Sequence, residues 1–393
     1  MTKLFNITGK ALSGEWGTDD ENGNGIPVLR TTNFTNEGIV NFDNVVTRTI
    51  TRKNIEEKFL RTGDIIIEKS GGSDKQPVGR VIYYDGPENK YLFNNFTGLL
   101  RIKNQKEWFP RYVFYSLYAN YRKGGTRAFE NKTTGLHNLK IDDYIERYEV
   151  ADANYEKQIS VCYRLDKISD IIEKRRQQLA AFDELVKARF VEMFGDVIKN
   201  DKGWPQYIFE DITESRLGKM LDAKQQKGNC KFPYLANFNV QWFRFELKNL
   251  NEMDFDKEDQ VEFELKDGDL LVCEGGEIGR CAVWHNELQP CYFQKALHRV
   301  RCNTNIVLPD YMARWFQYNC EHGGFSSIEG AKATISHLPG AKLKRLQVVT
   351  PPIDIQKIFV DFVEQVDKSK VAVQKSLEKT QLLFDSLMQE YFG

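Results

Sequence analysis

The sequence predicts an α+β fold in which two homologous, β-rich mixed α/β modules are separated by two long helices. We expect the helices to pair antiparallel as a coiled coil, in a pseudo-twofold, circular arrangement. Three observations support this: an internal repeat, short runs of strand-forming residues inside each repeat, and a heptad pattern at the end of each repeat. The chain has 393 residues, of which 41% are hydrophobic, and this is enough for two packed cores.

The internal repeat consists of motifs that recur in the same order roughly 200 residues apart. The matching motifs are IPVLRTTNF at 26–34 with FPYLANFNV at 232–240, GDIII at 63–67 with GDLLV at 268–272, and MFG at 193–195 with YFG at 391–393. Each GD motif is followed by two glycines and then by a Gly-Arg pair. Several motifs with nearly constant spacing indicate a duplication.

Each module contains short runs rich in Val, Ile, Tyr and Phe between turn-forming residues, and these runs predict strands. A helix that starts with proline is expected near 110–121 and again near 309–319. The predicted boundaries are 1–150 and 197–350 for the modules, and 151–196 and 351–393 for the long helices. The run WPQYIFEDITES at 204–215 has little counterpart before residue 9. We therefore expect the first module to be shortened, or completed by residues near the C-terminus, with Gly393 close to Met1.

The heptad pattern predicts a seam between the two long helices. The predicted seam residues are Leu165, Ile168, Ile172, Leu179, Phe182, Val186, Val366, Val373, Leu377, Phe384 and Leu387. Arg175 and Lys370 interrupt the apolar pattern, and such polar seam residues commonly fix register. A first helix from Arg164 to Phe194 would be roughly 45 Å long. The alternative is that each helix folds back on its own module.

Composition excludes several classes of function. The net charge of −1 argues against coating nucleic acid by bulk charge, and the seven cysteines show no metal-binding or disulfide spacing. No phosphate-binding loop, dinucleotide-binding turn or metal-spaced histidine pair is present, so we expect no catalytic residue and no metal site. Asp64, Glu68 and Lys69 superficially resemble a nuclease cluster, but adjacent strand residues face opposite ways. Without a signal peptide or membrane-spanning run, a cytoplasmic protein is expected.

Candidate DNA-binding residues lie in three kinds of loop that recur in both repeats. Residues 121–140 and 322–346 are basic and rich in small residues, so their amides can approach phosphate. The segments after the GD motifs and the polar turns near 94 and 294 supply further donors and acceptors for base edges. The candidates are Lys69, Ser70, Gly72, Ser73, Lys75, Arg80, Asn94, Asn95, Lys123, Thr126, Arg127, Lys132, Thr134 and His137, and then Glu274, Gly276, Arg280, Gln294, Lys295, Gly324, Ser326, Lys332 and Thr334. The alternative is that these are only solvated loops and turns.

Together, the [IF]P-x-L, GD-[IL]-[IL] and Gly-Arg motifs, the basic glycine-rich loops and the heptad helices ending in [MY]-F-G resemble the specificity subunit of type I restriction–modification systems. The resemblance covers nearly the whole chain. It implies that each module is a target recognition domain for one half of a split site in double-stranded DNA.

The resemblance also implies that the helices set the gap between the half-sites and bind two methyltransferase subunits. A motor–nuclease restriction subunit is a further expected partner. S-adenosylmethionine, ATP and magnesium would then belong to these partners, and this chain would bind no cofactor and catalyse no reaction. Two alternatives stay open: a self-contained DNA methyltransferase or endonuclease fragment, and a coiled-coil adaptor that does not contact DNA.

Overall fold

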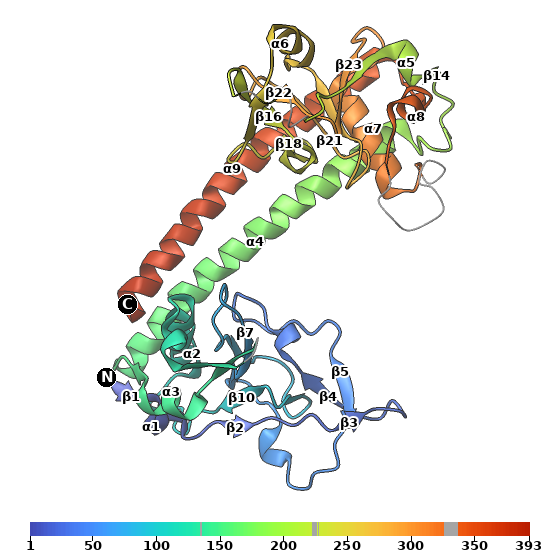
Figure 1. Cartoon of the computed structure of the whole chain (residues 1–393). Coiled ribbons are helices and arrows are strands. Elements are labelled where there is room, and N and C mark those ends of the chain that lie inside the picture. Colours follow the sequence, from blue (N-terminus) through green and yellow to red (C-terminus); the bar gives the residue numbers. More distant parts are fainter. Residues whose placement is uncertain (134–135, 222–225, 227, 326–336) are drawn as a thin grey trace. The chain divides into compact units, whose positions relative to one another are not determined.

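The computed structural model describes the chain except for residues 134–135, 222–225, 227 and 326–336 (Figure 1). Its contacts divide the chain into two compact units. Unit 1 comprises Met1–Arg176 and Lys375–Gly393, and unit 2 comprises Gln177–Gln374. Each unit therefore contains one β-rich module together with a part of each long helix.

Unit 1 is built around a four-stranded antiparallel sheet in the order β2-β10-β6-β8. A second four-stranded sheet, β3-β5-β4-β9, contains a parallel pair, β4 with β9. The elements of the first repeat are β1 (Thr2–Lys3), α1 (Leu4–Thr8), β2 (Leu12–Ser13), β3 (Thr18–Asp19), β4 (Ile26–Leu29), η1 (Thr31–Asn33), β5 (Val46–Thr49), η2 (Glu56–Lys58), β6 (Ile65–Glu68), β7 (Ser70–Gly72), β8 (Val81–Tyr83), β9 (Leu92–Phe93), β10 (Thr97–Leu100), α2 (Pro110–Arg122), η3 (Gly125–Phe129), β11 (Glu130–Thr133), β12 (Leu136–Leu139), α3 (Ile141–Arg147), β13 (Glu149–Val150) and α4 (Tyr155–Phe194).

Unit 2 repeats this plan with the antiparallel sheet β15-β23-β20-β21 and the parallel pair β16 with β22. The elements of the second repeat are β14 (Gln206–Ile208), α5 (Phe209–Ile212), β15 (Thr213–Leu217), β16 (Lys231–Leu235), η4 (Asn237–Asn239), β17 (Val240–Gln241), β18 (Arg244–Phe245), β19 (Asn251–Asp254), α6 (Lys257–Phe263), β20 (Leu270–Cys273), β21 (Cys281–Val283), β22 (Tyr292–Phe293), β23 (Leu297–Cys302), α7 (Pro309–Glu321), α8 (Gly340–Lys344), β24 (Gln347–Val349) and α9 (Ile353–Phe392). The predicted α+β class and the duplication are confirmed.

The apolar GD strands are buried on both faces, which explains why they do not alternate with polar residues. In β6, Ile65 and Ile67 enter the core that includes α2, whereas Ile66 enters a second core on the opposite face. In β20, Leu270 and Leu271 divide between two cores in the same way. Because successive strand side chains point to opposite faces, a strand between two cores needs a continuous apolar run.

The first module has counterparts of the elements formed by 204–215, so the expectation of a shortened module is wrong. Strand β1 and helix α1 correspond to β14 and α5 of the second repeat. The Leu4 amide donates to the Tyr148 carbonyl at 2.8 Å, and the Phe209 amide donates to the Leu346 carbonyl at 2.9 Å. Leu4 and Phe209 are both fully buried. Backbone pairing and one buried apolar side chain define this strand–helix pair, and many different sequences can supply both. The first repeat therefore forms it without a visible match to the run at 204–215.

Each long helix has 40 residues, and α4 begins at Tyr155, inside the predicted range 151–196 but nine positions before the heptad stretch that starts at Arg164. Its first turn is fixed by a buried glutamine. The Gln158 side chain accepts a hydrogen bond from the Phe109 amide at 2.7 Å and donates to the carbonyls of Glu107 and Ala153. The heptad pattern could not reveal this segment because it packs on the module rather than on the other long helix.

The second repeat contains the same glutamine arrangement. Gln356, which is fully buried, accepts from the Leu308 amide at 2.9 Å and donates to the carbonyls of Ile306 and Pro351. Phe109 and Leu308 immediately precede α2 and α7, at positions where no side-chain cap satisfies the helix N-terminus. Each glutamine therefore joins the root of a long helix to the start of the module's own helix.

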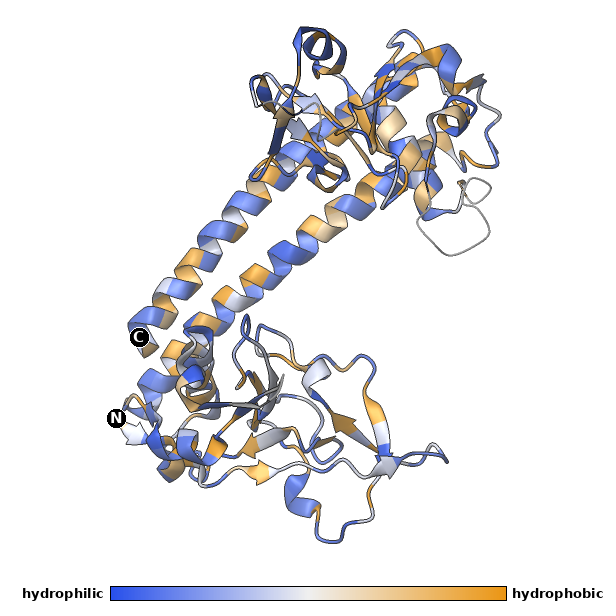
Figure 2. Ribbon diagram, in the orientation of Figure 1, coloured by the Kyte–Doolittle hydropathy of each residue, from blue (hydrophilic) through white to orange (hydrophobic). Residues whose placement is uncertain are grey.

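The two helices run antiparallel in each unit. In unit 1, Leu165 and Ile172 share a core with Phe384, and Arg175 donates to the Ser376 carbonyl at 2.8 Å and to the Thr380 hydroxyl. All eleven predicted seam residues are buried or half-buried, and Figure 2 shows apolar residues recurring along both helices. Thus Arg175, which interrupts the heptads, bonds across the seam.

In unit 2, Val186 and Val366 share a core, and Lys370 pairs with Asp183. Helix α4 starts in unit 1 and ends in unit 2, whereas α9 starts in unit 2 and ends in unit 1. The alternative in which each helix folds back on its own module is therefore wrong.

Both termini belong to unit 1 and contact neighbouring parts of it. The Met1 ammonium pairs with Asp152, while the Phe392 ring lies 5.1 Å from the ring of Tyr112. The Tyr112 hydroxyl in turn donates to the Ala151 carbonyl at 3.2 Å. The expected proximity of the chain ends is therefore present within this unit.

Replacing Gln158 or Gln356 by alanine is expected to lower the free energy of unfolding by about 2–3 kcal/mol, because a buried amide and two carbonyls lose their partner. Denaturant unfolding followed by circular dichroism measures this change. Gln178→Ala, at an exposed position of α4, is the matched control and should change stability by less than about 0.5 kcal/mol. Equal stabilities for all three variants would contradict the structural role of the buried glutamines.

Candidate nucleic-acid interface

Three loops meet at one end of the main sheet in unit 1. The segment after β6 includes Lys69, whose amide donates to the Phe96 carbonyl at 2.8 Å in the β9–β10 turn. The Leu139 amide donates to the Lys69 carbonyl at 2.8 Å, and β7 pairs with β12 of the β11–β12 hairpin. Three separate predicted candidate segments therefore converge, and we call this place the three-loop junction.

Unit 2 has the same junction. The Glu274 amide donates to the Ala296 carbonyl at 2.9 Å, and the Leu338 amide donates to the Glu274 carbonyl at 2.6 Å. Gly275 forms an antiparallel bridge with His337. The loop after β20, the β22–β23 turn and the end of the basic loop therefore meet just as their counterparts do in unit 1.

The sequence did not predict a fourth segment that backs this junction. A Cβ on Gly14 would lie 2.1 Å from the Asn94 carbonyl oxygen, and a Cβ on Gly218 would lie 2.3 Å from that of Gln294. Glycine is therefore needed where these loops approach the turn. The sequence signal for this fourth segment is that Gly14 and Gly218 stand at matching places in the two repeats.

The predicted residues differ widely in exposure. Ser73, Lys75, Asn95, Lys123, Arg127, Gly276 and Lys295 are exposed, and Lys69, Ser70, Glu274, Gln294 and Gly324 are half-buried. Lys123 donates to the Phe392 carbonyl at 3.4 Å, so it contacts the last turn of α9. Thr134, Ser326, Lys332, Thr334 and the side chain of Lys132 lie outside the described residues.

The two Gly-Arg arginines, which the sequence predicts as DNA contacts, support the module internally. Arg80 donates to the carbonyls of Phe34 at 2.9 Å and Thr31 at 2.8 Å. Arg280 donates to the Asn237 carbonyl at 3.0 Å and to Glu277 at 2.9 Å. A guanidinium has fixed donor directions, so donors used for these loops are not available to guanine. The arginines instead hold η1 and η4 in place.

Four further candidates are buried because the loops fold over their own polar residues. Thr126 is fully buried against Gly79, and Asn94 is 4% exposed and accepts a hydrogen bond from the Thr97 hydroxyl at 3.3 Å. His137 is 6% exposed, with Nδ1 3.0 Å from Glu130. Gly72 is buried and pairs with His137 in the sheet. Loop composition alone does not distinguish a polar side chain that bonds inside its loop from one that faces solvent.

The acidic residues near the sheet are structural. Arg101 bonds both carboxylate oxygens of Asp64, at 2.8 and 2.7 Å, at one end of β6. At the other end Glu68 lies 3.6 Å from Arg80, and burial raises the Glu68 pKa although Arg80 opposes the shift. Arg301 bonds Asp269 in the same bidentate manner. No group of three metal-ligating side chains occurs among the described residues.

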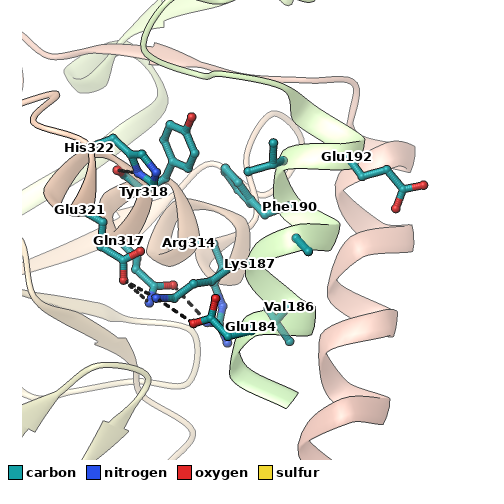
Figure 3. A pocket seen from close by; sticks show the side chains of 12 residues that line it. Glu184, Val186, Lys187, Phe190, Glu192, Arg314, Gln317, Tyr318, Glu321 and His322 are labelled. Atoms are coloured by element: carbon teal, nitrogen blue, oxygen red, sulfur yellow. Dashed lines mark hydrogen bonds and ion pairs between the residues drawn. The ribbon is translucent and has the colours of Figure 1, made fainter. Parts of the chain in front are cut away.

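A separate cavity of about 640 Å³ lies between α4 and α7 in unit 2 (Figure 3). Lys187 from α4 pairs with Glu321 from α7 at 2.9 Å. Arg314 stacks 3.4 Å from the centroid of Phe243, and burial lowers its pKa to about 10. These charged groups are already engaged with one another or with an aromatic ring, so the cavity shows no arrangement for catalysis.

Comparison with known proteins finds similar chains of one kind. Residues 201–382 match the model of the type I restriction modification DNA specificity domain. Over most of its length the chain is similar to the specificity subunits of type I restriction–modification systems. It is 23% identical over 398 residues to the EcoKI specificity subunit of Escherichia coli K12, covering 93% of this chain and 82% of that one. It is 22% identical over 193 residues to the putative MjaX specificity subunit of Methanocaldococcus jannaschii, covering 48% and 45% of the two chains.

Two solved structures have the same fold as this chain. The S subunit from M. genitalium aligns with a TM-score of 0.56 at 14% identity, covering 100% of this chain and 95% of that one. A chain from a study of complex assembly and conformational transition of the type I R-M system aligns with a TM-score of 0.59 at 13% identity, with 100% and 96% covered. Among the described helices, none is both long enough and apolar enough to cross a membrane.

Replacing Arg80 by lysine is expected to lower the free energy of unfolding of the protein by about 1–2 kcal/mol, because an ammonium cannot reproduce the planar double donation to two carbonyls. Thermal unfolding measures the change. Arg61→Lys, at an exposed arginine, is the control and should be nearly neutral. A destabilisation no larger than that of the control would contradict the internal role of Arg80.

Proposed function

We propose that this specificity subunit reads a bipartite target in double-stranded DNA, each unit contacting one half-site through its three-loop junction. The observation that carries the proposal is the recurrence of the same junction on the same sheet end with different side chains. Lys69, Asn95 and Phe96 in unit 1 correspond to Glu274, Lys295 and Ala296 in unit 2. Sequence is read by side chains at base edges, so equal scaffolds with unequal side chains suit two different half-sites.

Positive charge for phosphate contact is supplied locally, since the whole chain has a net charge of only −1. Lys75 and Arg127 are exposed in unit 1, and Lys295 is exposed in unit 2. Phosphate contacts position a protein on the duplex but carry no base information. We assign these cations to positioning and the half-buried residues of the junction to base readout.

The paired helices act in this proposal as the ruler between the half-sites. A continuous helix of 40 residues is about 60 Å long, and each one is joined to a module at its root by a buried glutamine. Antiparallel packing in both units and the cross-seam bonds of Arg175 and Lys370 support a fixed register. The number of residues in the helices would then determine the length of the DNA spacer.

The proposed partners are two methyltransferase subunits, with a motor–nuclease restriction subunit where the system has one. In this proposal the methyltransferase uses S-adenosylmethionine and the restriction subunit uses ATP and magnesium. The specificity subunit binds none of these and supplies only recognition and assembly. The bidentate pairing of Asp64 and Asp269 with arginines supports this, because these acids are already engaged in holding the fold.

Deleting one heptad from each helix, residues 177–183 together with the facing residues 370–376, should shorten the spacer by about three base pairs. Seven helical residues correspond to about 10 Å, and one base pair to about 3.4 Å. Sequencing of methylated bases in a host that carries the complete system measures the spacer. The control deletes 177–183 alone, which puts the seam out of register and should abolish methylation. An unchanged spacer in a double-deletion complex that still methylates would contradict the ruler.

The purified chain, incubated with DNA, magnesium, ATP and S-adenosylmethionine, is expected to transfer no methyl group and cut no strand. Radiolabelled methyl transfer and gel analysis of the DNA measure the two activities. Adding the methyltransferase subunits should produce methylation at the bipartite site, which serves as the positive control. Methylation or cleavage by the chain alone would support a self-contained enzyme instead.

A further inference from the structure

The two three-loop junctions carry opposite charges at one equivalent position. In unit 1 this position, directly after β6, is Lys69, and in unit 2, directly after β20, it is Glu274. The backbone is held by the same bonds, since each residue's amide donates to the neighbouring turn and each carbonyl accepts from the leucine at the end of the basic loop. The repeats therefore present an ammonium and a carboxylate from the same place on a shared scaffold.

Lys69 is half-buried, and its ammonium donates to the Ser13 hydroxyl at 3.0 Å. Burial lowers the pKa of Lys69, and nearby Lys58 acts in the same direction. No carboxylate lies within ion-pair distance of its ammonium among the residues that the structure describes. Asp142 opposes this shift from beyond ion-pair distance, so the donors of the Lys69 ammonium that Ser13 does not use are open to a partner.

Glu274 is also half-buried, but its surroundings differ. Leu217 occupies the strand position that Ser13 has in unit 1, so the hydroxyl partner is missing. Within the described part of the chain, no side-chain or backbone donor bonds the Glu274 carboxylate. The neighbouring acid Glu277, in contrast, accepts from Arg280 at 2.9 Å and from the Trp242 indole at 2.8 Å.

A carboxylate without a hydrogen-bond donor weakens binding to DNA, because it loses water and is repelled by the phosphates. A donor on the DNA would offset this cost in binding free energy. Duplex DNA offers such donors only at base edges. In the major groove these are the N4 amino group of cytosine and the N6 amino group of adenine. Lysine has the opposite requirement, and its typical base partners are the O6 and N7 acceptors of guanine. The same position therefore suits different bases in the two units.

We propose that Lys69 and Glu274 are specificity-determining residues with opposite readout: Lys69 selects a guanine in the half-site of unit 1, and Glu274 selects a base with an exocyclic amino group in the half-site of unit 2. This inference rests on the proposed function, because it needs both junctions to face DNA. It adds the hydrogen-bonding character of one base in each half-site. Lys295, exposed beside Glu274 in unit 2, supplies the phosphate contact there.

The test uses the complete system in its host and maps methylated sites for Glu274→Gln and Lys69→Met. Glutamine keeps the size of the side chain but loses the charge, so one position in the unit 2 half-site should relax by about tenfold or more. Lys69→Met keeps the length of the side chain but loses the donors, and it should relax one guanine in the other half-site only. If the wild-type motif has cytosine at the position that Glu274 reads, the donor is the N4 amino group. If it has adenine there, the donor is the N6 amino group.

Glu277→Gln is the matched control, because this acid lies in the same loop but its oxygens are already bonded within the module. Its methylated motif should be unchanged. Thermal unfolding of each variant subunit shows whether the fold is retained. A wild-type motif that is not bipartite would overturn the proposed function itself, which separates that failure from failure of this inference.

Three results would overturn the inference while leaving the proposed function intact. The first is a Glu274→Gln motif identical to the wild-type motif. The second is relaxation in both half-sites from a single variant, which would mean that the residue acts through the overall fold. The third is a uniform loss of methylation at all sites, since a base-reading residue changes which sequence is preferred.

Discussion

The buried glutamine at the root of each long helix is the interaction on which the rest of the architecture depends. Gln158 and Gln356 satisfy the amides of the residues just before α2 and α7, together with two carbonyls each, so a long helix and a module form one packed body at that point. Apolar side chains of the same helices, such as Leu165 and Phe359, pack into the module cores beside these bonds. Hydrogen bonds in a water-excluded site are strong and directional, so they fix the angle at which each helix leaves its module.

Charge in the modules is used mainly to build them. The GD aspartates pair with arginines on the adjacent strand, and the Gly-Arg arginines hold the η1 and η4 turns by their carbonyls. These interactions occur in both repeats, which is why the motifs recur in the sequence. Only a small number of charged side chains at each junction stays available for a partner. In the proposed readout, recognition would depend on a few positions, with the opposite charges of Lys69 and Glu274 among them.

Duplication explains how one chain obtains two modules with a common geometry. The same backbone bonds fix the loop after the central strand in both units, so a change of side chain alters what is presented without moving it. The long helices complete the arrangement, since each repeat contributes one helix that begins in its own unit and ends in the other. Neither repeat forms a whole unit alone, because each core includes side chains from the helix of the other repeat.

The sequence by itself determined the duplication, the α+β class, the two long helices and the seam residues, because these depend on periodic apolar patterns and on glycines that local geometry requires. It also placed the candidate loops, which the fold then brought together. Only the tertiary structure decided that Arg80 and Arg280 bond inward, that Thr126, Asn94 and His137 are buried, and that the first module begins with β1 and α1. It also revealed the buried glutamines. These outcomes depend on which backbone groups lack a partner after folding, and the chain's local pattern does not carry that information.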